Sequence, residues 1–390
     1  MIVRQLDSAE APRGVTKLPN NPPAQTHHGG ASATVGATEE SAMRAGEARA
    51  AAADWIVRYA QDQPGFRGAY IVGSTVALAG EDALPLGSDV DVAVVTNEDS
   101  PQLKEGKVLY QGVLLEIIQR LWSELSSADE VSSAYHLAHG LRVDTIISDP
   151  TGDLRSLQKI IGDRFREESW VRRRCQNARE KVERGLSAID PGTPWHDQVT
   201  GWLFPTGVTT HILLVAALRN PTVRLRYLAA RQVLADYRLS GFYPELLGML
   251  GCAELTQRQA EEHLAALEGT FDAAAAVART RFFFSSDITP AARPIAIDAT
   301  RKLIQAGNHR EAVFWLVATS ARCHKILAFD ALRATQRAHA ATFDALLADL
   351  GIESTAGLLA RASEVHRRLP DVWGMAETII ATNPEISHSR

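Results

Sequence analysis

The chain has 390 residues, of which 45% are apolar, so it can bury a large core without disulfides or structural metal ions. Acidic and basic residues nearly balance, 46 against 41, and the net charge of −5 argues against a protein that coats nucleic acid. Three widely spaced cysteines exclude a disulfide framework or a paired-cysteine zinc site. Because no run approaches 18 apolar residues and the N-terminus lacks a secretory apolar core, we expect a soluble cytoplasmic protein.

The first half of the chain alternates short strands with helices. Residues 1–40 are rich in Pro, Gly, Thr and Ala without an apolar period, which predicts a flexible tail. Residues 41–62 place apolar side chains at helical spacing, and Pro64 and Gly65 end that helix. We expect strands at 69–72, 90–95 and 141–147, a helix at 122–139, and either a hairpin or one long strand broken at Gly112 over 106–119.

The second half of the chain has almost no strand signals. Long amphipathic stretches predict helices at 154–186, 209–239, 256–279, 295–306, 309–349 and 354–368. The predicted fold class is therefore α+β, with a small mixed-sheet domain over residues 41–152 followed by an all-α helical domain over residues 153–390.

Two acidic residues open the second predicted strand, in the segment Ser88-Asp89-Val90-Asp91. Residues two apart on a strand share a face, so Asp89 and Asp91 place two carboxylates side by side. A divalent cation relieves their repulsion, and hard oxygen ligands suit Mg²⁺. Gly73 and Ser74 follow the preceding strand, where a flexible turn lets backbone amides approach a phosphate closely.

A third carboxylate would complete a site for two metal ions, the arrangement used for in-line attack on a phosphate. Glu116 is a lone acid in the apolar strand 114–118, which is costly unless the acid is used or paired. Asp144 has Arg142 on the same strand face as a ready partner. Glu116 is therefore favoured, and Asp144 remains the alternative.

The order Gly-Ser, spacer and Ser-Asp-x-Asp at the head of an apolar strand resembles the nucleotidyltransferase superfamily related to DNA polymerase beta. Within it, the closest likeness is to antibiotic (aminoglycoside) adenylyltransferases, in which a helical domain follows a small α/β domain. The resemblance implies that Gly73, Ser74 and Ser88 lie at the nucleotide, that Asp89 and Asp91 bind Mg²⁺, and that a carboxylate such as Glu116 holds metal or acts as general base. It also implies ATP or another nucleoside triphosphate as cosubstrate.

Basic residues concentrate at the start of the helical half. For Arg172, Arg173 and Arg174 we favour ordinary ion pairs on a helix face over contact with a triphosphate. The second cluster, residues 219–227, contains Arg224, which we predict to contact nucleotide or acceptor, and Thr222 is a candidate helix cap there.

The leading hypothesis is Mg²⁺-dependent transfer of a nucleoside monophosphate, AMP from ATP, to a hydroxyl of a small molecule such as an aminoglycoside-like compound, with release of pyrophosphate. Two alternatives stay open. The acceptor could be RNA or a protein, as in toxin–antitoxin nucleotidyltransferases, or the fold could serve a non-catalytic nucleotide-binding regulator. The partners expected are a nucleoside triphosphate and a small acceptor, without long nucleic acid or membrane, and the sequence does not fix the oligomeric state.

Overall fold

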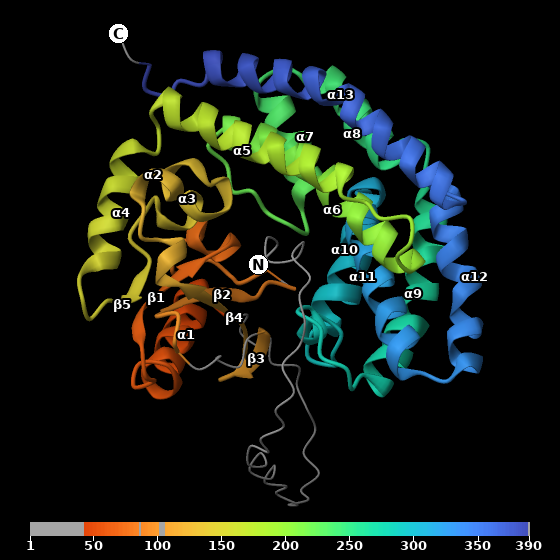
Figure 1. Ribbon diagram of the computed structural model, residues 1–390, viewed down its shortest axis with the longest axis horizontal. Coiled ribbons are helices and arrows are strands. Elements are labelled where there is room, and N and C mark those ends of the chain that lie inside the picture. Colours follow the sequence, from red (N-terminus) through yellow and green to blue (C-terminus); the bar gives the residue numbers. More distant parts are fainter. Residues whose placement is uncertain (1–42, 86, 101–105, 389–390) are drawn as a thin grey trace, which may run out of the picture. The chain divides into compact units, whose positions relative to one another are not determined.

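The structure is a computed structural model that describes residues 43–85, 87–100 and 106–388, so the predicted tail at 1–40 lies outside the described residues. Arg44–Arg390 form one compact unit. A small mixed sheet occupies the N-terminal half and helices follow it, which confirms the α+β class (Figure 1). The last strand ends at Ser148 and the next helix begins at Asp153, next to the predicted boundary at residue 152, while the division into two domains stays a prediction.

Within the described residues, five strands form one sheet in the order β3-β4-β2-β1-β5. The central pair β2 and β4 is parallel, and the other neighbours are antiparallel. Residues 106–119 form a hairpin, because Gln111 and Gly112 both adopt positive φ angles, 48° and 76°, and turn β3 directly into β4. The strand bounds are β1 Phe66–Val72, β2 Val90–Thr96, β3 Gly106–Tyr110, β4 Val113–Leu121 and β5 Ile146–Ser148.

Helices cover the sheet. The first helix, α1 (Ala45–Tyr59), packs against β2 and its neighbours. On the other face, Tyr70, Ala93 and Val95 form a buried core with helices α2 (Ala128–Ser133), α3 (Tyr135–Leu141) and α4 (Asp153–Arg164). Because side chains alternate along a strand, Asp91 projects from the same face as Ala93 and Val95. The acidic residues of β2 therefore belong to the face that carries these later helices.

A single large apolar core holds the helices of the second half together, with Trp202, Phe271 and Phe314 fully buried in it. Burial of such aromatic side chains dominates the energetics of a core. The helices are α5 Glu168–Ser187, α6 Trp195–Ala216, α7 Arg226–Asp236, α8 Tyr243–Leu250, α9 Gln257–Val277, α10 Ala299–Gln305, α11 His309–Asp330, α12 Arg333–Asp349 and α13 Thr355–Thr382. Single helical turns precede or connect them at η1 Ser74–Ala77, η2 Trp122–Glu124, η3 Ser240–Phe242, η4 Ser285–Asp287 and η5 Pro294–Asp298.

Several predicted elements are shorter or more divided than expected. The strand predicted at 141–147 is wrong at its start, since Leu141 ends α3 and only Ile146–Ser148 pair as β5. The side chain of Asp144 accepts a hydrogen bond from the backbone N–H of Ile146 (3.1 Å), a local turn that competes with strand pairing. The expected helix at 122–139 is likewise divided into η2, α2 and α3.

The segment between α6 and α7 differs from the prediction of a helix over 209–239. Leu218 adopts a positive φ of 57°, Pro221 lacks a backbone N–H, and α7 begins only at Arg226 with Leu225 as its cap, so Thr222 is not a helix cap. Instead the carbonyl of Thr222 is hydrogen-bonded to His211 Nε2 (2.9 Å). In Figure 1 this green connection extends from the helices toward the sheet.

Two helices, α6 and α11, are long and apolar enough to cross a membrane by length and composition alone. Within the molecule, 78% and 72% of their apolar windows are buried, as in core helices of a globular protein. The cytoplasmic location stays a prediction.

Candidate metal centre

Three carboxylates meet on one face of the sheet. Asp91 on β2 lies directly opposite Glu116 on β4 in the parallel register, and Asp89 precedes Asp91 by one pleat. One oxygen from each of the three side chains lies within 4.8 Å of the others. We call these three residues the acidic cluster. Such a set of hard oxygen donors could hold a divalent cation of the Mg²⁺ type.

Gly73 lies against the acidic cluster. Its φ of 78° and ψ of −154° belong to a region that only glycine adopts readily. A Cβ atom built at residue 73 would overlap Oδ2 of Asp91 and lie 2.7 Å from its Cγ. A glycine here is therefore required both by the turn after β1 and by the close approach of the Asp91 carboxylate.

The loop after Gly73 is fixed to α1. Arg49 of α1 donates hydrogen bonds to the carbonyls of Thr75 (2.8 Å) and Leu78 (3.0 Å), and the backbone N–H of Gly46 donates to the carbonyl of Gly80 (2.8 Å). The long spacer between Gly73 and the acidic cluster is thus held at several points along α1.

The acidic cluster is poorly solvated and its charges oppose one another. Burial raises the pKa of Asp91 well above its ordinary value, and the negative charges of Asp89 and Glu116 raise it further. Burial also raises the pKa of Glu116, although the Lys107 ammonium acts in the opposite direction. Bringing a cation to these residues removes the conflict, so their environment fits a metal ion.

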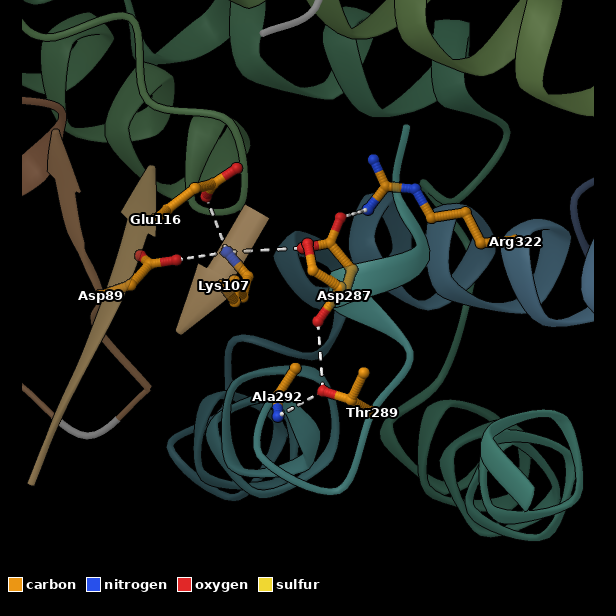
Figure 2. Close-up of polar contacts among 8 residues, drawn as sticks. Asp89, Lys107, Glu116, Asp287, Thr289, Ala292 and Arg322 are labelled. Carbon is orange, nitrogen blue, oxygen red and sulfur yellow. Dashed lines mark hydrogen bonds and ion pairs between the residues drawn. The ribbon is translucent and has the colours of Figure 1, made fainter. Parts of the chain in front are cut away.

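Lys107 on β3 is the cationic partner of the cluster. It lies opposite Glu116 in the antiparallel hairpin, and its Nζ bonds to Asp89, to Glu116 (2.7 Å) and to Asp287 (3.4 Å), as Figure 2 shows. Burial opposes its charge, but the carboxylates of Glu116, Asp89 and Asp287 together raise the pKa of Lys107 above its ordinary value. The ammonium therefore stays charged and offsets part of the negative charge of the cluster.

Asp287 brings the helical half of the chain to the site. It belongs to η4 and accepts a hydrogen bond from Arg322 of α11 (2.8 Å), whose side chain is only 8% exposed (Figure 2). The close packing of η4 on β3 requires a glycine at residue 106, because a Cβ atom there would lie 2.6 Å from Ser286 Oγ. The chain Lys107–Asp287–Arg322 links the acidic cluster to the helical core.

The predicted site residues do not all come together. Asp89, Asp91 and Glu116 form the cluster, Gly73 touches it, Ser74 is exposed at the start of η1, and Ser88 is half-buried next to Asp89. Asp144 lies elsewhere, in an exposed ion pair with Arg155 (3.1 Å). The geometry thus joins Glu116, and not Asp144, to the Asp89–Asp91 pair, and the catalytic roles of these residues stay predictions.

Arg224 lies within electrostatic range of the cluster. Burial lowers the pKa of Arg224, and the negative charge of Asp89 acts in the opposite direction. In contrast, Arg172 forms ion pairs with Glu168 of its own helix (2.9 Å) and with Glu377 of α13. The expected ion pair on a helix face is wrong for Arg174, which is buried and donates hydrogen bonds to the carbonyls of Ser132 and Phe165. Lys107 of β3 is thus in direct contact with the acids, and Arg224, in the connection between α6 and α7, adds a second positive charge near Asp89.

Sequence reasoning missed Lys107 and Asp287. A signal for Lys107 exists: counting outward from the Gln111-Gly112 turn pairs Tyr110 with Val113 and continues to Lys107 opposite Glu116. No local pattern marks Asp287, which reaches the sheet only through the packing of η4 on β3.

Comparison of the chain with protein-family models, curated proteins and solved structures finds no match.

Proposed function

We propose that this protein is a Mg²⁺-dependent nucleotidyltransferase that moves a nucleoside monophosphate from ATP or another nucleoside triphosphate to a hydroxyl of a small molecule. The proposal is carried by one observation, the meeting of Asp89, Asp91 and Glu116 on adjacent parallel strands. The glycine turn at Gly73, in contact with Asp91, supports it further.

The three carboxylates would hold the cation, which supplies positive charge to align the triphosphate and to stabilise the charge that develops on its oxygens. In the reaction, the acceptor oxygen forms a bond to the α-phosphorus while the bond from that phosphorus to the αβ-bridging oxygen breaks. Pyrophosphate leaves, and a carboxylate of the cluster, Glu116 in this proposal, takes the acceptor's proton or orients the cation.

The neighbouring cations have separate roles. Lys107 holds Asp89 and Glu116 in place through its two ion pairs, and Asp287 fixes Lys107 from the helical half. In this proposal Arg224 would donate to a phosphate oxygen of the nucleotide, and its being within electrostatic range of Asp89 supports that role.

The test is transfer from α-labelled ATP with Mg²⁺ to a panel of small hydroxyl compounds, followed through labelled product and pyrophosphate. We expect Asp89→Asn and Asp91→Asn to lose activity by roughly a thousandfold or more, the scale of losing metal-based charge stabilisation. Asp144→Asn is the matched control, because Asp144 is an exposed acid outside the cluster. If Asp89→Asn and Asp91→Asn turned over as well as the parent, the assignment would be wrong.

Glu116→Gln separates the third carboxylate from the alternative. We expect this variant to lose orders of magnitude in rate while Asp144→Asn keeps the rate of the parent protein. The reverse result would move the third position to Asp144.

A further inference from the structure

A group of basic side chains, none of which belongs to the acidic cluster, lies inside the molecule. Its members come from β4 and four helices. Each of them is a neighbour of Tyr135 or of another member. We call them the basic cluster: Arg120, His136, Lys181, His211 and Arg226. The Tyr135 ring centroid lies 5.4 Å from the imidazole of His136, 5.5 Å from that of His211 and 5.7 Å from the Lys181 ammonium. Tyr135 also lies within electrostatic range of Arg226.

Several donors of the cluster have no acceptor among the described residues. These are Lys181 Nζ and both terminal nitrogens of Arg226, all shielded from solvent, and Nδ1 of His136 and of His211 is likewise shielded and without a partner. The Arg226 side chain is fully buried, and only its Nε is hydrogen-bonded, to the carbonyl of Val223 (2.7 Å). A buried cationic donor without a partner costs several kcal/mol in general, so a protein retains such a group where something binds to it.

The charged groups acting on Lys181 are all cationic. Burial comes first, and Arg226, Arg120 and Arg184 then add to it in lowering the pKa of Lys181 to about 7. Arg120 is paired with Glu124 (3.2 Å), so the carboxylate at the edge of the cluster is already engaged. The unpartnered donors therefore face a region with an excess of positive charge.

The position of Arg226 is built into the neighbouring helix. Gly207 lies in the interior of α6, where glycine weakens a helix. A Cβ atom there would overlap Nη1 of Arg226 and lie 2.6 Å from Cε2 of Phe314. The guanidinium lies over the Phe314 ring, 3.9 Å from its centroid. Gly207 on α6 and Phe314 on α11 therefore both pack directly against this cation and fix its position.

We propose that the basic cluster binds an anion of the phosphate class, whose oxygens accept hydrogen bonds from Lys181, Arg226 and His136. Phosphate oxygens supply several acceptors at once and carry the negative charge that the cluster lacks. Arg224, in the connection between α6 and α7, is within electrostatic range of Asp89, and Arg226, two residues further on, begins α7 and belongs to the basic cluster. The proposal needs no metal ion and does not rest on nucleotidyl transfer.

Calorimetric titration of the full chain with pyrophosphate and with inorganic phosphate, in low-chloride buffer with chelator, tests this site. We expect the parent protein to bind pyrophosphate without metal, and Lys181→Met to bind it about tenfold to a hundredfold more weakly, the loss of one charge-assisted hydrogen bond. Lys302→Met is the matched control, since Lys302 is an exposed lysine on α10.

Thermal unfolding provides a second readout that separates binding from folding. Without an anion, Lys181→Met should unfold at the parent's temperature or above it, because an apolar side chain replaces an unpaired buried ammonium. With pyrophosphate, the parent should gain stability and Lys181→Met should gain little. The proposal is overturned if neither anion binds the parent at millimolar concentration, or if Lys181→Met binds as tightly as Lys302→Met.

Two further ligands identify the source of the anion. If ATP competes with pyrophosphate in the presence of chelator and adenosine does not, the polyphosphate of a nucleotide occupies the site. If pyrophosphate or phosphate binds and ATP does not compete, the ligand is an independent inorganic anion. Asp91→Asn should keep metal-free anion binding, so a failure of nucleotidyl transfer and a failure of the anion site give different results.

Discussion

Replacement of Gly73 by alanine is the sharpest structural test of the site. The backbone at residue 73 has φ 78° and ψ −154°, a conformation that costs a residue with a side chain about 1–3 kcal/mol. The added methyl would also overlap Oδ2 of Asp91, so the carboxylate must move out of the acidic cluster or the turn must open. Gly73→Ala should therefore lower the stability of the protein and reduce the additional stability that Mg²⁺ provides.

Both effects of Gly73→Ala are large enough to measure. At roughly 2 cal/mol/K per residue, a compact unit of about 350 residues has an unfolding entropy near 0.7 kcal/mol/K, so 1–3 kcal/mol lowers the melting temperature by about 1–4 °C. At a Mg²⁺ concentration of about one hundred times the dissociation constant, the parent should gain about 2.7 kcal/mol from the cation. The displaced Asp91 carboxylate should remove most of that gain in Gly73→Ala.

The assay is thermal and chemical unfolding with and without Mg²⁺ or Mn²⁺, with Gly80→Ala as control. Gly80 lies in the same connection, and a Cβ atom there has open space around it. Gly80→Ala should match the parent in stability and metal response. The reasoning is refuted if Gly73→Ala behaves like Gly80→Ala in both measurements.

Three further predictions concern buried charges. Lys107→Met should bind Mg²⁺ or Mn²⁺ several-fold more tightly than the parent, because the ammonium competing for Asp89 and Glu116 is gone; weaker metal binding in calorimetry would contradict this. Asp287→Asn should destabilise the protein by about 3–5 kcal/mol in chemical denaturation, since it leaves the buried Arg322 without its carboxylate, and a loss below about 1 kcal/mol would argue against the ion pair. Between about pH 7 and the ordinary lysine pKa of 10.5, Lys181 holds a proton in the unfolded chain but not in the folded protein. The free energy of unfolding of the parent should therefore rise with pH by up to about 1.4 kcal/mol per pH unit relative to Lys181→Met. Equal pH dependence of stability in the two proteins would refute the lowered pKa of Lys181.

Local patterns predicted the elements that local interactions determine. The Gly73 turn, the paired aspartates at the head of β2 and the break at Gly112 are all marked by residue types with strong backbone or strand preferences, although the sequence leaves open whether that break is a hairpin or an interrupted strand. Glu116 was favoured over Asp144 because a lone acid in an apolar strand needs a partner, and the structure places it opposite Asp91.

The rest depends on tertiary packing. Asp144 fails as a strand residue because its own side chain bonds to the backbone of Ile146, a competition that an alternating pattern does not reveal. Asp287 and Arg226 acquire their surroundings from helices far away in the sequence, so neither the ion-pair chain nor the basic cluster leaves a local signal.

In the proposed function, the acidic cluster binds the divalent cation that carries the nucleotide. Calorimetric titration of ATP with and without Mg²⁺, in the parent, Asp91→Asn and Asp144→Asn, tests it most directly. We expect Mg²⁺ to strengthen ATP binding in the parent and in Asp144→Asn, and Asp91→Asn to lose this dependence on Mg²⁺. Unchanged Mg²⁺-dependent binding of ATP in Asp91→Asn would contradict it.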